Sequence, residues 1–153
     1  MEGAAVEEET SGSALAQGWC VLSLLHNTIE AHVEQALQAA HGISSREFSV
    51  LAALSERQGA KMRMSELSEA IVLSQSATTR LVNRLENRGL LSRVLCDTDR
   101  RGIYTSVTEA GHRLLAEARP TNDAALAEIL RTAERDPQLA PLADALRRHG
   151  PGA

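Results

Sequence analysis

Two short helical segments followed at once by a pair of β-prone runs constrain the fold of this chain more than any other feature. Ser65 is a suitable N-cap for the segment SELSEAI, and Ser74 caps a second segment that runs to Arg88 and ends at Gly89. The runs LLSRVL and IYTSV then flank the polar turn CDTDRRG, which is typical of a β-hairpin. The sequence therefore predicts a helix-turn-helix unit followed by a hairpin.

The remainder of the chain is predicted to be helical. Apolar residues recur at three- and four-residue steps from about Ser13 to Ala40, and Ser44 with Glu47 has the spacing of a capping box that opens the next helix. Another helix is expected from Thr108, with Pro120 kinking or dividing it. Aromatic residues make up only 2% of the chain, so Leu, Ala, Val and Ile must build the core. The predicted fold class is mainly α with a minor β part.

Charge is distributed unevenly along the chain. The formal net charge is −4, yet residues 57–101 carry nine basic and five acidic residues, a local charge of +4. Residues 1–12 carry four Glu and no basic residue, so a disordered acidic tail is expected there. No run approaches the ~18 apolar residues of a membrane span and the N-terminus is acidic where a signal peptide would be basic, so we expect a cytoplasmic protein.

The helix that follows Ser74 has one apolar and one polar arc. Ala77, Leu81, Val82 and Leu85 fall together at about 100° per residue, and polar side chains occupy the opposite arc. Short polar groups on a helix can read base edges in the major groove of DNA, while arginines meet phosphates. A solvated helix face is the alternative. The side chains expected at a DNA interface are Ser74, Gln75, Ser76, Thr78, Thr79, Arg80, Asn83 and Arg84.

The run from Leu67 to Gly111 resembles the winged helix-turn-helix core of the MarR family of bacterial transcriptional regulators. The matching motifs are Ser74-x-x-x-x-Thr79-Arg80, Leu85-Glu86 with Gly89-Leu90, the Asp-Arg-Arg of residues 99–101, and Thr108-x-x-Gly111. Together with two helices before this core and two after, the resemblance covers nearly the whole chain beyond residue 13. It implies a DNA-binding lobe over residues 44–107 and a helical dimerisation region over residues 13–43 and 108–150.

The resemblance further implies a homodimer, more often a repressor, that binds a pseudo-palindromic operator. The periodicity of the first helix supports dimerisation, because its apolar surface exceeds what one small lobe can cover. In the wing, the resemblance implies that Arg101 enters the minor groove, whose narrow form concentrates negative potential. Asp99 would orient an arginine and Arg100 would contact phosphate. Affinity should then depend steeply on salt.

Family members often release DNA when a small aromatic or phenolic effector binds between the lobe and the dimerisation helices. Trp19, His26 and Arg46 are candidates for lining such a pocket, although core or surface packing is the alternative for each. No residue pattern identifies the effector, and no cofactor is expected.

Cys20 raises the alternative of a redox-responsive regulator with the same fold. In the hydroperoxide-sensing branch of the family a reactive cysteine lies in the first helix, but tyrosines surround it there, and the one tyrosine of this chain is Tyr104, in the hairpin. His26 and His32 lie about 240° apart on a helix, so no metal site is expected. Neither cysteine belongs to a CxxC pair.

Two other classes of function are alternatives. A winged-helix module for protein contact would bind no DNA and would not need arginines on both the helix and the hairpin. Enzyme motifs such as Gly-x-Ser-x-Gly, a Walker loop, GxGxxG or HExxH are absent from the sequence, so no enzyme activity is expected.

Overall fold

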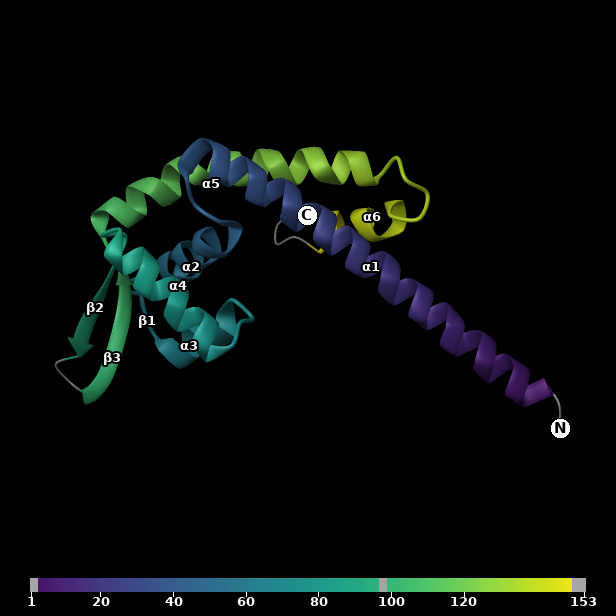
Figure 1. The fold of residues 1–153 in the computed structure, drawn as a ribbon, viewed down its shortest axis with the longest axis horizontal. Helices are drawn as coiled ribbons and strands as arrows, with labels where there is room; N and C mark the ends of the chain where they lie inside the picture. The colour runs from purple at the N-terminus through teal and green to yellow at the C-terminus, as the bar shows by residue number, and fades with distance from the viewer. Residues whose placement is uncertain (1–2, 97–98, 150–153) are drawn as a thin grey trace. The chain divides into compact units, whose positions relative to one another are not determined.

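The computed structural model describes the backbone of residues 3–96 and 99–149 and the side chains of residues 12–95 and 102–149. Most of this chain is helical, with one small sheet (Figure 1). In chain order the elements are α1 (Gly3–His41), α2 (Ser45–Glu56), β1 (Lys61–Arg63), α3 (Met64–Ala70), α4 (Gln75–Asn87), β2 (Leu91–Cys96), β3 (Asp99–Val107), α5 (Glu109–Ala133) and α6 (Ala140–Arg148). The predicted fold class is confirmed.

The chain divides into two compact units. Residues 34–122 form one, called here the central unit, and residues 1–33 with 123–153 form the other, called the terminal unit. The central unit extends beyond the DNA-binding lobe predicted for residues 44–107 at both ends. The division of roles between lobe and dimerisation region stays a prediction.

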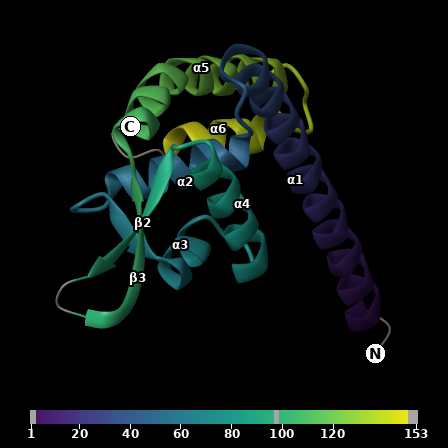
Figure 2. The same cartoon turned by 60° about the vertical axis from the view of Figure 1, so that its left-hand side comes forward.

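The central unit packs α2, α3, α4 and the first part of α5 against the sheet. The sheet is antiparallel with strand order β1-β3-β2, and the register pairs Leu91 with Val107 and Leu95 with Ile103. Figures 1 and 2 both show the hairpin of β2 and β3 extending past the helices of this unit. The buried core consists of Val50, Leu51, Leu54, Met62, Leu67, Ile71, Leu81, Val82, Leu85, Leu90, Leu91, Val107 and Leu115.

The hairpin is joined to α5 by a close backbone approach. The Thr108 hydroxyl donates to the Gly89 carbonyl at 2.7 Å and accepts from the Gly111 N–H at 3.1 Å. A Cβ on Gly111 would lie 2.2 Å from the Leu90 carbonyl oxygen. The motif Thr108-x-x-Gly111 therefore fixes the start of α5 against the chain that leaves α4.

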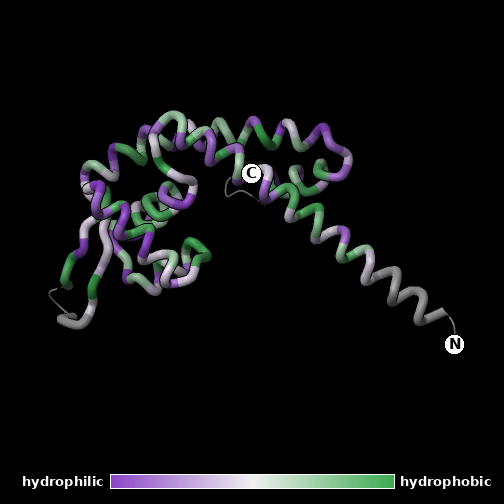
Figure 3. Tube along the Cα trace, in the orientation of Figure 1, coloured by the Kyte–Doolittle hydropathy of each residue, from purple (hydrophilic) through white to green (hydrophobic). Residues whose placement is uncertain are grey.

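The terminal unit combines parts of α1 and α5 with α6. Its core consists of Leu25, Ala133, Leu139 and Ala143, with Val21, Ile29, Leu130 and Leu142 packed against it. Hydrophobic and hydrophilic stretches alternate along α1, as its amphipathic pattern predicts (Figure 3). None of the helices within the described residues has the combination of length and apolar character that a membrane span requires.

Three helices bear on the sequence-based expectations. α3 begins at Met64 with Arg63 as its N-cap, so Ser65 lies inside the first turn and the prediction that it caps this helix is wrong. α1 begins at Gly3 rather than near Ser13, so helical backbone includes residues for which a disordered tail was expected; Ala and Glu, which are frequent there, have high helix propensity. α5 is continuous through Pro120, so the helix is not divided there, and a kink at this residue stays a prediction. A proline inside a helix lacks the N–H that would donate one backbone hydrogen bond, so this 25-residue helix forms without that bond.

Candidate nucleic-acid interface

The interface is built on the start of α4. Ser74 is the N-cap, and its hydroxyl oxygen accepts from the Ala77 N–H at 3.2 Å. The hydroxyls of Ser74 and Ser76 lie 3.2 Å apart. This arrangement gives α4 an exposed, polar first turn from which backbone and side-chain donors face solvent.

One face of α4 is exposed and the opposite face is buried, as its periodicity predicts. Leu81, Val82 and Leu85 are buried in the core. The exposed predicted residues are Ser74, Gln75, Ser76, Thr79, Arg80, Asn83 and Arg84. They form a continuous polar strip with two guanidinium groups, called here the recognition face.

Thr78 departs from this pattern. Its side chain is 0% exposed, and its hydroxyl donates to the Ser74 carbonyl at 2.9 Å. Since that bond satisfies the hydroxyl inside the helix, Thr78 packs on the core side of α4 and does not belong to the recognition face.

Asn83 is tied to the hairpin by a residue that the sequence analysis missed. Arg93 of β2 donates from Nη2 to the Asn83 Oδ1, and its Nε lies 3.3 Å from Oε2 of Glu86. The amide nitrogen of Asn83 is then the group left to face a ligand. The strand register pairs Arg93 with Thr105. The contact between Arg93 and Asn83 could be predicted from the sequence only if this register were known.

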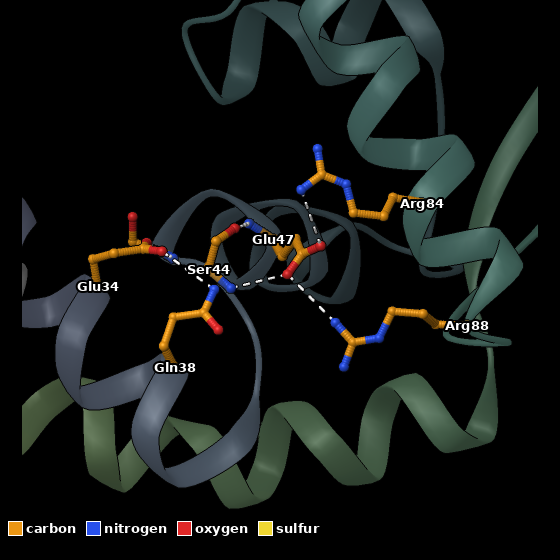
Figure 4. Close-up of polar contacts among 7 residues, drawn as sticks. Glu34, Gln38, Ser44, Glu47, Arg84 and Arg88 are labelled. Carbon is orange, nitrogen blue, oxygen red and sulfur yellow. Dashed lines mark hydrogen bonds and ion pairs between the residues drawn. The ribbon is translucent and has the colours of Figure 1, made fainter.

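Glu47 is a second residue whose contact with the recognition face the sequence analysis did not predict. It caps α2, as predicted, but its carboxylate also lies 3.4 Å from Nη1 of Arg88 and 3.9 Å from Nη1 of Arg84 (Figure 4). The Arg84 side chain stays 60% exposed, so its guanidinium remains accessible. Because α2 and α4 are far apart in the sequence, no local sequence pattern predicts this contact.

The predicted wing residues lie at the end of the hairpin. Asp99, Arg100 and Arg101 begin β3, while their side chains lie outside the described residues, as do Asp97 and Thr98 altogether. Their roles stay predictions. Tyr104 also lies on β3, and Lys61 and Arg63 of the neighbouring strand β1 each lie 5.4 Å from the centre of its ring. These two side chains add positive charge to the exposed side of the sheet.

The candidate effector residues are only partly brought together. Trp19 and His26 line a shallow surface depression of about 470 Å³ on α1, with Leu22, Ser23 and Asn27. Arg46 is exposed in the other compact unit, so a pocket shared by all three stays a prediction.

The redox alternative stays a prediction. Cys20 is an exposed free thiol on α1. Among the residues that the structure describes, no group of three or more His, Cys, Asp or Glu side chains is placed to hold a metal ion.

Comparison with known proteins finds similarity to bacterial transcriptional regulators. The model of the MarR family matches residues 41–102. The transcriptional repressor MprA of Escherichia coli K12 is 35% identical over 100 residues, which are 63% of this chain and 57% of that protein. The HTH-type transcriptional regulator MhqR of Bacillus subtilis 168 is 30% identical over 110 residues, 72% of this chain and 74% of that protein.

A solved structure extends the likeness to the fold. The structure of CouR from Rhodococcus jostii RHA1, bound to p-coumaroyl-CoA, superposes with a TM-score of 0.65 at 29% identity. The match covers 83% of this chain and 84% of that one.

Proposed function

This chain belongs to the MarR family, and from that premise we propose that it is a transcriptional regulator that binds a pseudo-palindromic DNA operator as a homodimer and represses transcription. The recognition face of α4 carries this proposal. It exposes short polar side chains together with Arg80 and Arg84, directly opposite a face that is fully packed. A major groove admits a helix of this kind.

The side chains of the recognition face divide into two roles. Gln75, Ser76 and the amide nitrogen of Asn83 present donors and acceptors to base edges, which supplies sequence preference. Arg80 and Arg84 contact phosphates, which fixes orientation and supplies affinity. In the wing, Arg101 enters the minor groove, oriented by Asp99, and Arg100 contacts phosphate.

Dimerisation is supported by the apolar surface of the terminal unit. Leu15, Trp19 and Leu22 follow one stripe of α1 and are 74%, 68% and 45% exposed, and Leu146 of α6 is 49% exposed. Leu22 and Leu146 also border an apolar depression of about 230 Å³. A two-fold partner that covers this surface would remove several large apolar side chains from water.

Release of the operator by a small aromatic effector is the regulatory part of the proposal. CouR, at 29% identity, has been solved bound to p-coumaroyl-CoA, which sets a precedent for a phenolic ligand on this fold. Trp19 and His26 are the residues of the α1 depression suited to contact an aromatic ring. Such a ligand acts only if it favours one spacing of the two recognition helices.

This function takes place at the chromosome, in the cytoplasm, and involves no catalytic step. The experiment that tests it is selection from a random-sequence library of DNA duplexes, followed by fluorescence anisotropy with the selected duplex. We expect a two-fold symmetric consensus and an affinity that falls steeply with salt. Failure to enrich any sequence would overturn the proposal.

A further inference from the structure

A buried carboxylate lies where α2 begins. The Glu47 side chain is only 4% exposed, and its Oε2 accepts from the Ser44 N–H at 2.9 Å while the Ser44 hydroxyl accepts from the Glu47 N–H at 3.0 Å. This pair is a capping box. Gln serves in a capping box as well as Glu does, so the cap alone does not account for a buried negative charge.

The negative charge of Glu47 is paired with arginines of the segment that carries the recognition face. Arg84 lies on α4 and Arg88, one turn further on, is the C-cap of that helix. Both guanidinium groups reach toward the same carboxylate (Figure 4). Oε1 lies 3.9 Å from Arg84 and Oε2 lies 3.4 Å from Arg88. Because a buried carboxylate is costly without partners, these contacts hold the C-terminal half of α4 to the first turn of α2.

The same junction is tied to the end of α1. Oε2 of Glu34 accepts from the Ser45 N–H at 2.6 Å, and the Gln38 amide donates to Oε1 of Glu34 at 3.3 Å. Ser45 is the neighbour of the capping residue Ser44. A continuous series of polar contacts therefore runs from α1 through the start of α2 to α4, entirely within the central unit.

We infer that Glu47 is a positioning residue for the recognition face: its carboxylate fixes the orientation of α4 through Arg88 and aims the exposed guanidinium of Arg84 at the DNA backbone. This inference rests on the proposed function. Arg88 is 37% exposed and held by the shorter contact, whereas Arg84 is 60% exposed and held by the longer one. Arg88 therefore holds α4 in place against Glu47, and Arg84 is the side chain that contacts the DNA backbone.

Whether a substitution of Glu47 raises or lowers the affinity for DNA distinguishes a positioning role from a purely electrostatic one. Glu47→Gln removes one negative charge beside the interface and releases two arginines, so charge alone predicts tighter binding. Loss of positioning predicts weaker binding. Gln keeps an acceptor for the Ser44 N–H, so the cap of α2 is retained. Glu109→Gln is the matched control, because it changes the net charge equally at an exposed pair, Glu109 with Arg113, on α5.

The first measurement is fluorescence anisotropy with the duplex that the wild-type protein selects from the random library. We expect Glu47→Gln to bind about tenfold more weakly, the scale of a lost charge-assisted hydrogen bond, and Glu109→Gln to stay within about twofold of the wild type. Binding by Glu47→Gln that equals or exceeds that of Glu109→Gln overturns the inference.

The second measurement needs no DNA. Backbone hydrogen exchange of the full chain should show faster exchange along α4 in Glu47→Gln, with α2 still protected. Arg88→Met should change the exchange along α4 in the same direction, and the double variant should exchange no faster than Glu47→Gln, because Glu47→Gln already removes the contact with Arg88. Unchanged exchange along α4 overturns the inference. If the wild type selects no duplex, the proposed function fails, and the exchange data still decide whether Glu47 positions α4.

Discussion

Arg93 of β2 donates to the side-chain oxygen of Asn83 on α4, which joins the hairpin directly to the helix that carries the recognition face. The same guanidinium lies 3.3 Å from Glu86, one turn of α4 away from Asn83. The two DNA-contacting parts of the proposed interface are therefore linked by one side chain in addition to the buried core.

Replacing Arg93 should uncouple the hairpin from α4. We expect Arg93→Met to lower the free energy of unfolding by less than about 1 kcal/mol, because the pair is partly exposed. Affinity for the selected duplex should fall about tenfold, since two contact surfaces must then be aligned on binding. Arg113→Met is the control: it removes the same charge from an exposed pair at the same 3.3 Å. Equal affinities of the two variants would refute the link.

Gly111 should tolerate no side chain. A Cβ there would lie 2.2 Å from the Leu90 carbonyl oxygen and 2.7 Å from Cγ1 of Val107. We expect Gly111→Ala to lower the free energy of unfolding in urea by about 1–3 kcal/mol, because backbone must move to admit the methyl group. Gly18 on α1 has open space, so Gly18→Ala should instead stabilise the chain by about 0.5–1 kcal/mol. A neutral Gly111→Ala would show that the close approach is not maintained.

A charge on the apolar stripe of α1 should prevent dimerisation. Leu22 is 45% exposed and borders the apolar depression of the terminal unit. We expect Leu22→Glu to sediment as a monomer at a concentration where the wild type is a dimer, because burying an unpaired carboxylate is costly. Val72→Glu, at a site 84% exposed in the central unit, should remain dimeric. A dimeric Leu22→Glu would place the interface elsewhere.

Glu34 should contribute a pH-dependent part of the stability. Burial raises the pKa of its carboxyl, but hydrogen bonds from Ser45 and Gln38 outweigh that effect and leave the pKa below its ordinary value. A carboxylate with a depressed pKa stabilises the fold above its unfolded pKa of about 4.3, and this contribution disappears as the pH falls through the lower folded pKa. Glu34→Gln should therefore cost about 1 kcal/mol at pH 7 and almost nothing near pH 2. A difference that does not vary with pH in denaturant titrations would contradict this account.

The periodic features of the structure were predictable from the sequence. The buried and exposed arcs of α4 follow from 3.6-residue periodicity, and Ser74 and Ser44 cap their helices as expected. The hairpin also follows from local composition. Each of these depends on residues within a few positions of one another.

The remaining features depend on tertiary contacts. Glu47 meets Arg88 across 41 positions, and no local pattern connects them. Thr78 is polar yet buried, because its hydroxyl is satisfied by a carbonyl of its own helix. Val72 adopts a φ of 55°, an uncommon conformation for a β-branched residue that the turn between α3 and α4 imposes. The wing arginines were identified from a motif, and their contacts stay predictions.

The salt dependence of binding to the selected duplex tests the recognition face most directly. The slope of the logarithm of the binding constant against the logarithm of the salt concentration counts neutralised phosphates, at about 0.9 for each. We predict a steep slope for the wild type, a slope shallower by about 1 for Arg80→Ala, and no change for Arg113→Ala, an exposed arginine on α5. A slope for Arg80→Ala equal to that of the wild type would contradict the assignment of α4 as the DNA-binding helix.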